Sequence, residues 1–140
     1  MRCYNGLEVM KQLQKICRMK LTAKITYAEL QTFGSYFTLA FKCAMDLKLF
    51  STSNYAAYYN LRSLHKKLLV KVFAETQKLT LKLDVNEYES LKWLRDSTAS
   101  RIKLDIYTVA VTRGIFDTLH QHELRISHAS NFSKLVTNGG

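Results

Sequence analysis

Lysine and threonine alternate with apolar residues in two short stretches of this chain, KLTAKIT at residues 20–26 and KLTLKLD at residues 78–84. Successive side chains of a β-strand point to opposite faces, so the polar side chains of each stretch would share one face. A lysine can donate to phosphate oxygens and guanine acceptors, and a threonine can bond a base edge or touch a thymine methyl. The candidates for contact with nucleic acid are therefore Lys20, Thr22, Lys24, Lys78, Thr80 and Lys82.

The same lysines have a second interpretation. An exposed strand gains solubility from charged side chains, because charge discourages pairing with other chains. The alternation alone does not separate a DNA-reading role from this protective one. On the opposite face, Leu21, Ala23 and Ile25 in the first strand, and the leucines at 79, 81 and 83 in the second, are expected to face the helices.

A capping signal follows each predicted strand. Thr26 with Glu29, and Asp84 with Glu87, have the spacing in which the first side chain bonds the third helical N–H and the acid bonds back. We therefore expect a helix from residue 27 to about 50 and another from residue 85 to about 96. Polar breaks at 51–54 (STSN) and 97–100 (STAS) precede further helices, at 55 to about 77 and at 101 to about 122.

The recurrence of this order indicates an internal duplication. Lys24 corresponds to Lys82, and Glu29 to Glu87. The predicted organisation is a basic amphipathic helix at 1–19, a first strand-helix-helix unit at 20–77, a second at 78–124 and a loosely held tail at 125–140. The fold class is mainly α, with the two short strands paired into a two-stranded antiparallel ribbon, either within one chain or between two chains.

The last predicted helix has a wide apolar face and is expected in the core. Four of its side chains are assigned to that core, namely Leu104, Ile106, Val109 and Phe116. Tyr55, Tyr58 and Tyr59 could stack on bases, but their helical spacing favours the core for them as well.

The stretch KLTLKLDVNEYESLKWLRDSTASRIKLDIYTVAV resembles a ribbon-helix-helix unit: a basic strand, an acidic cap, a short helix, a polar break and an apolar helix. The resemblance covers residues 78 to about 120 well and 20–77 less well, since the first helix of that unit is much longer. It implies an antiparallel ribbon in the major groove of double-stranded DNA. It also implies helix starts whose backbone N–H groups hold a phosphate, at Ser53 and at Ser100 with Arg101, although serine there also serves as an ordinary cap.

The charge is uneven. Of the formal net charge of +10, residues 1–24 and residues 53–83 each carry +5. Such a field favours nucleic acid first, and an anionic membrane surface or an acidic protein next. No apolar run reaches the roughly 20 residues that cross a bilayer, and no secretory signal is present, so a cytoplasmic protein without a membrane partner is expected.

Other chemistries have little support. Cys3, Cys17 and Cys43 form no C-x-x-C pair and are expected as reduced thiols. His120 and His122 are two apart, which points them in different directions on a helix, so neither a metal nor another cofactor is expected. No motif of a nucleotide-binding loop, a hydrolase or a metalloprotease occurs, and we expect no enzyme.

Two functions remain. The first is a DNA-binding protein that reads the major groove with its ribbon, such as a repressor or an accessory factor of a plasmid or phage. The second is a mostly helical structural or assembly protein of a virus or other large complex, whose apolar helices bury against copies of itself, as a homo-oligomer, or against a larger complex. The first predicts DNA binding that weakens steeply with salt, and the second a defined assembly without nucleic acid.

Overall fold

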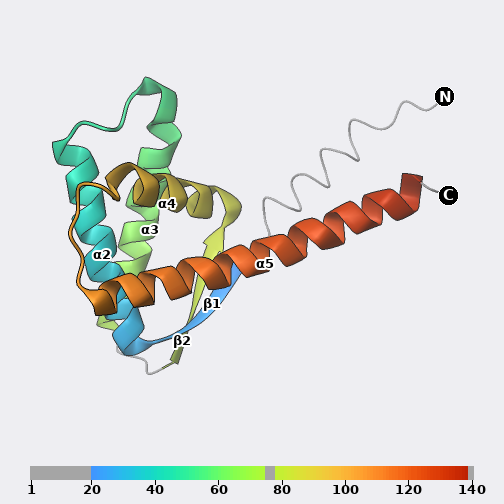
Figure 1. Cartoon of the computed structure of the whole chain (residues 1–140), viewed down its shortest axis with the longest axis horizontal. Coiled ribbons are helices and arrows are strands. Elements are labelled where there is room, and N and C mark those ends of the chain that lie inside the picture. Colours follow the sequence, from blue (N-terminus) through green and yellow to red (C-terminus); the bar gives the residue numbers. More distant parts are fainter. Residues whose placement is uncertain (1–19, 75–77, 139–140) are drawn as a thin grey trace.

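The chain, seen in a computed structural model, is mainly helical with one two-stranded antiparallel sheet among the residues described, 20–74 and 78–138 (Figure 1). Side chains are described for these residues except 73, 78 and 128–138. The elements are β1 (Lys20–Thr26), α2 (Tyr27–Asp46), a short 3-10 helix η1 (Thr52–Asn54), α3 (Tyr55–Phe73), β2 (Lys78–Asp84), α4 (Val85–Thr98) and α5 (Ile106–Asn138). The predicted helix at 1–19, with Cys3 and Cys17, lies outside the described residues.

The two strands pair within one chain, as one of the two predicted arrangements requires. Their register sets Leu21 opposite Leu83, Ala23 opposite Leu81 and Ile25 opposite Leu79. Five of these six side chains are buried and Leu79 is partly buried. The apolar alternation therefore turns one face of the ribbon to the helices, as predicted, and leaves the lysine and threonine face outward.

Both predicted capping boxes are present. The Thr26 hydroxyl accepts from the Glu29 N–H at 3.2 Å, and the Glu29 carboxylate accepts from the Thr26 N–H at 3.0 Å. Asp84 and Glu87 make the same pair of bonds at 2.7 and 3.0 Å. Each strand thus turns directly into a helix, α2 or α4, because the side chains satisfy the first N–H groups of that helix.

The core lies between the inner face of the ribbon and the helices. On α2, Phe33 is fully buried and packs edge-on against Phe116 of α5, with ring centroids 6.3 Å apart. Figure 1 shows α2 and α3 side by side as a hairpin, with α4 and α5 crossing it. The remaining fully buried large side chains come from both strands and from α2, α3, α4 and α5: Leu21, Leu30, Phe37, Leu61, Leu64, Leu68, Leu81, Leu83, Tyr88, Leu91, Leu94 and Leu119.

The last helix differs from the prediction at both ends. Asp105 caps α5, since its carboxylate accepts from the Thr108 N–H at 2.7 Å, so the helix begins at Ile106 rather than near 101. It continues to Asn138, through most of the segment predicted as a tail. The core assignment of its first turn is wrong because Ile106 is 89% exposed and Val109 is 37% exposed, whereas Phe116 is buried as predicted.

The preceding break also differs. Residues Ser97 and Thr98 belong to α4, and the Thr98 hydroxyl donates to the Leu94 carbonyl at 2.7 Å. The connection from 99 to 105 is irregular, and Leu104 within it is partly buried. The apolar period that runs through Ile102 and Leu104 therefore describes a packed connection and not the start of a helix.

Candidate nucleic-acid interface

The register gathers the predicted polar residues on the outward face of the ribbon. Lys20 stands opposite Asp84, Thr22 opposite Lys82, and Lys24 opposite Thr80. The side chains of Lys20, Lys24 and Lys82 are exposed, and those of Thr22 and Thr80 are half-buried. At the far end of the ribbon the backbone of Lys78 pairs with Thr26, while the Lys78 side chain lies outside the described set. Five of the six predicted side chains thus share one face.

A side chain from a helix reaches each edge of the ribbon. On the β1 side, the Thr22 N–H donates to His122 Nδ1 of α5 at 2.9 Å, and the Thr22 hydroxyl lies 3.3 Å from the same atom. On the β2 side, Lys71 Nζ of α3 donates to the Thr80 carbonyl at 3.1 Å. These two backbone groups point away from the partner strand and are already bonded, so another strand cannot pair with them. Its outward face is the part left for a partner.

Threonine and lysine approach one another closely across the strands. The outward bonds of Thr22 and Thr80 mean that these residues sit in non-hydrogen-bonded pairs with Lys82 and Lys24, where facing side chains are nearest. The centre of the face is therefore a compact group of two lysines and two threonines. Its hydroxyl and ammonium groups offer both donors and acceptors to base edges.

Positive charge continues from the ribbon onto α3. Lys66, Lys67, Lys71 and Lys82 line a hollow of about 380 Å³ between α3 and β2. Burial lowers the pKa of Lys71, and the nearby charges of Lys82 and Lys67 lower it further. The lysines are thus close enough to repel one another, which favours a bound anion.

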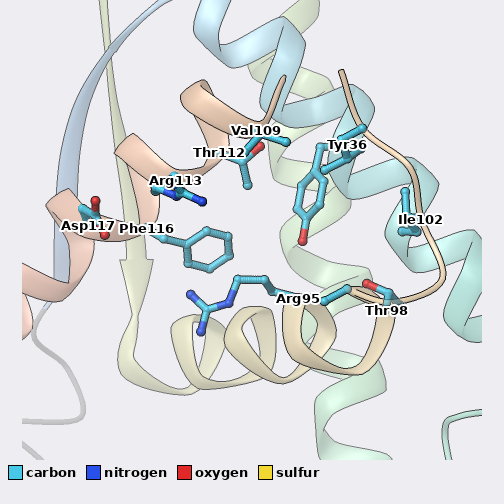
Figure 2. A pocket seen from close by; sticks show the side chains of 11 residues that line it. Tyr36, Arg95, Thr98, Ile102, Val109, Thr112, Arg113, Phe116 and Asp117 are labelled. Carbon is cyan, nitrogen blue, oxygen red and sulfur yellow. The ribbon is translucent and has the colours of Figure 1, made fainter. Parts of the chain in front are cut away.

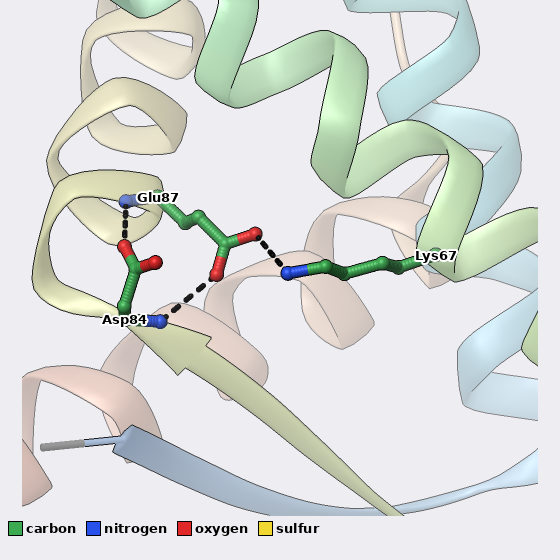
Figure 3. A network of polar contacts seen from close by, with 3 residues as sticks. All are labelled: Lys67, Asp84 and Glu87. Carbon is green, nitrogen blue, oxygen red and sulfur yellow. Dashed lines mark hydrogen bonds and ion pairs between the residues drawn. The ribbon is translucent and has the colours of Figure 1, made fainter. Parts of the chain in front are cut away.

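Glu87 neutralises one of these lysines (Figure 3). Its carboxylate is almost fully buried, accepts from the Asp84 N–H, and pairs with Lys67 Nζ at 3.0 Å. No described carboxylate lies within ion-pairing distance of Lys24, Lys71 or Lys82. These three, rather than Lys67, are left to meet an external anion.

The β1 side has a smaller polar hollow of about 280 Å³. It is lined by Thr22 and by four side chains of α5, namely Thr118, Gln121, His122 and Arg125. Arg125 and Lys71 therefore flank the ribbon from opposite sides. The sequence prediction did not include them: Lys71 has the local signal of a lysine one turn after Lys67, whereas nothing near Arg125 in the sequence indicates that α5 passes the ribbon.

The structure does not bring Ser53, Ser100 and Arg101 to this surface. Ser53 is in η1, within the connection at the end of the α2–α3 hairpin away from the ribbon (Figure 1), and its hydroxyl lies 2.8 Å from that of Ser51. Ser100 and Arg101 follow the end of α4, where the Arg101 N–H donates to the Thr98 carbonyl at 2.9 Å, and α5 starts only at Ile106. A phosphate site at a helix start is therefore not formed by Ser100 and Arg101.

Other predicted features have varied outcomes. Tyr55 and Tyr59 are 53% and 52% exposed, so their assignment to the core is wrong, while Tyr58 is half-buried. Among the described side chains, which do not include His128, no group of His, Cys, Asp or Glu could hold a metal ion. No helix within the described ranges has an apolar stretch long enough to cross a membrane.

Comparison of the chain with protein-family models, with curated proteins and with solved structures found no match. Function is therefore inferred from the residues and their geometry. The resemblance to ribbon-helix-helix proteins stays a prediction.

Proposed function

We propose that this protein binds double-stranded DNA without catalysing a reaction, by placing the outward face of its ribbon in the major groove. The observation that carries this proposal is the pairing of β1 with β2 in a register that sets Lys24 beside Thr80 and Lys82 beside Thr22 on one exposed face. The major groove of B-DNA admits a two-stranded β-ribbon. The inner face of the ribbon is buried against the helices, so only the lysine and threonine face is available for such insertion.

Two sets of residues have different roles in the proposal. Lys24, Thr22, Lys82 and Thr80 at the centre contact base edges, and their identities supply sequence preference. Lys71 and Arg125, on the flanking helices, contact the phosphates on either side of the groove and supply affinity on any sequence. Lys71 fits this role because it already lies against the strand, bonded to the Thr80 carbonyl.

The proposal includes the finer architecture of two strand-helix-helix units in one chain. It is supported by the observed order of strand, helix and helix, which occurs twice, and by the matching capping boxes at the two strand ends. One chain then supplies a complete ribbon. A protein of this kind suits a repressor or an accessory factor of a plasmid or phage.

The test is a selection of bound duplexes from random DNA, followed by fluorescence-anisotropy titration of the selected and a scrambled duplex at several salt concentrations. We expect tighter binding of the selected duplex and, on both, an affinity that falls linearly on logarithmic axes as salt rises. Failure to enrich any duplex, together with no binding of random DNA at about 50 mM salt, would refute the proposal.

A second function has one observation in its favour. The first turn of α5 exposes Ile106 at 89% and Tyr107 at 56%, and α3 exposes Val70 at 69%. Exposed apolar side chains of this size are common where copies of a protein associate. A structural or assembly protein would form a defined large species without nucleic acid, which light scattering of the purified, nuclease-treated protein would detect.

A further inference from the structure

A cavity of about 450 Å³ lies on a different part of the molecule, between α2, α4 and α5 (Figure 2). Tyr36 comes from α2, Arg95 from α4, and Thr112 and Phe116 from α5. The cavity is within the size range of small-molecule sites, roughly 300 to 1,000 Å³. It is walled on one side by the irregular connection from 99 to 105, which Asp105 creates by delaying the start of α5.

Two buried polar side chains at the cavity make no hydrogen bond to another described residue. Tyr36 is only 5% exposed, and Figure 2 shows its hydroxyl directed toward Arg95 and Thr98 across the cavity. Burial raises the pKa of Tyr36 to about 12, so this hydroxyl stays protonated and remains a donor. Thr112 is 6% exposed, and its buried hydroxyl also has no partner among the described residues. The Tyr36 hydroxyl faces the cavity and can donate to a ligand there, whereas the Thr112 hydroxyl is too enclosed to be reached from the cavity.

The cavity also carries positive charge. Arg95 donates from Nε to Asp96 at 2.9 Å, and its guanidinium lies 4.5 Å from the centre of the Phe116 ring. Its terminal nitrogens make no hydrogen bond within the described residues. Arg113 lies on the other side of the Phe116 ring in Figure 2 and makes no ion pair with a described carboxylate.

The carboxylates near the cavity are less well placed to bind a cation than the arginines are to bind an anion. Asp117 lies beyond Phe116 from Tyr36 in Figure 2, and Asp96 is occupied by Arg95. Among the other residues that line the cavity, Ile102, Leu104 and Val109 are apolar. The combination is a site with an apolar floor, a protonated hydroxyl and two guanidinium groups.

We propose that this cavity binds a small organic carboxylate with an apolar body. The terminal nitrogens of Arg95 and the Tyr36 hydroxyl donate to the carboxylate, since charge-assisted bonds from a guanidinium suit its planar oxygens. Arg113 at the rim adds attraction, and the apolar body packs against Leu104 and Phe116. The site shares none of these residues with the ribbon face, so this proposal does not rest on DNA binding.

The test uses four carboxylates of graded size and their uncharged amides: benzoate, 3-phenylpropionate, indole-3-acetate and octanoate. Binding to the whole chain is followed by calorimetry and by chemical-shift changes. We expect at least one acid to bind saturably and at least about tenfold more tightly than its amide, because the amide forfeits the charge-assisted bonds.

Variants then locate the site. Tyr36→Phe removes only the hydroxyl, and Arg113→Gln changes an exposed side chain, so both are expected to fold and to weaken the bound acid about three- to tenfold, the effect of one hydrogen bond. Tyr107→Phe and Arg62→Gln are matched controls at exposed positions outside the cavity and should bind as the parent does. Lack of saturable binding by all four acids, or equal binding by the Tyr36→Phe and Arg113→Gln variants, would overturn the proposal.

Discussion

At the scale of single residues, Lys71 links α3 to the ribbon. Its ammonium reaches from α3 to the Thr80 carbonyl and so occupies one outward-facing backbone group of β2. The same position brings it near Lys67 and Lys82, whose charges oppose its own protonation. A phosphate nearby would reverse that effect, since an anion favours the charged form of a lysine. Lys71 therefore has a structural role through its hydrogen bond and, in the proposed function, an electrostatic role toward DNA.

His65 provides a pH-dependent prediction. Its ring stacks on Phe37 with centroids 5.3 Å apart, and burial lowers its pKa from the ordinary value. The unfolded chain then binds a proton more readily than the folded one, so the stability from the neutral ring is complete above about pH 6.5 and is lost as the pH falls through the lower folded pKa. Urea unfolding should show a free energy of unfolding that declines from pH 7 to pH 5.

A substitution separates this histidine from the others. His65→Phe keeps the stacked ring and removes the titrating group, so its free energy of unfolding should decline less over the same pH range. His120→Gln, at an exposed position on α5, is the control, and the free energy of unfolding of this variant should decline with falling pH as that of the parent does. An unchanged decline in the His65→Phe variant would contradict the assignment.

At the scale of elements, Glu87 connects α3, β2 and α4. Its carboxylate caps α4, bonds the end of β2 through the Asp84 N–H and pairs with Lys67 of α3. The buried acid has little water to stabilise it, but the Lys67 side chain is 52% exposed, which screens the pair. The interaction is therefore expected to be modest.

A double-mutant cycle measures it. Lys67→Met and Glu87→Gln, alone and combined, should give a coupling free energy of unfolding of about 0.5 to 1 kcal/mol, with the pair stabilising. Each single variant retains the length of its side chain, so packing changes little. If the changes in the free energy of unfolding are additive within error, Lys67 and Glu87 do not interact in solution.

Local signals account for the elements that sequence predicted well. The alternation from Lys20 and from Lys78 defines two strands, and the boxes at Thr26 and Asp84 define helix starts, since both depend on residues at most a few positions apart. The start of α5 was missed because the apolar period continues past Asp105, whose capping role competes with it. The helix therefore begins after the Asp105 cap and not where the apolar period begins.

Long-range packing accounts for the parts of the candidate site that sequence did not predict. The outward lysines and threonines follow from the alternation itself. His122 meets Thr22 across 100 positions of the chain, and Arg125 lies in the same hollow. Their places depend on how α5 crosses β1, which no local pattern indicates. Similarly, Ile106 has the residue type of a core side chain but lies where no other element covers it.

At the scale of the whole molecule, the ribbon belongs to a single chain. Both strands and the helices against them come from residues 20–74 and 78–138, and the core they form is closed within one copy. Folding of this unit should therefore not require association. The midpoint of urea unfolding, followed by circular dichroism, should not change as the protein concentration rises about a hundredfold.

A midpoint that rises with concentration would mean that copies stabilise one another. The exposed side chains of Ile106 and Tyr107 would then be the first place to look, and Ile106→Gln should remove the concentration dependence. That result would favour the assembly function over the DNA-binding one.

The central claim is that Lys24 and Lys82 enter the major groove together, and its most direct test is the duplex affinity of Lys24→Gln/Lys82→Gln. Lys42→Gln/Lys103→Gln removes the same charge from exposed positions outside the ribbon and is the matched control. Both variants should unfold at the parent's urea concentration, since none of these side chains is buried. The affinities are measured by anisotropy titrations at several salt concentrations. If the two lysines contact bases, the ribbon variant should bind the selected duplex at least about fivefold more weakly than the parent. If they contact phosphates, the slope of its affinity against salt should be lower by about two. Should the ribbon variant bind every duplex as tightly as the control, with the same salt slope, the ribbon does not read DNA.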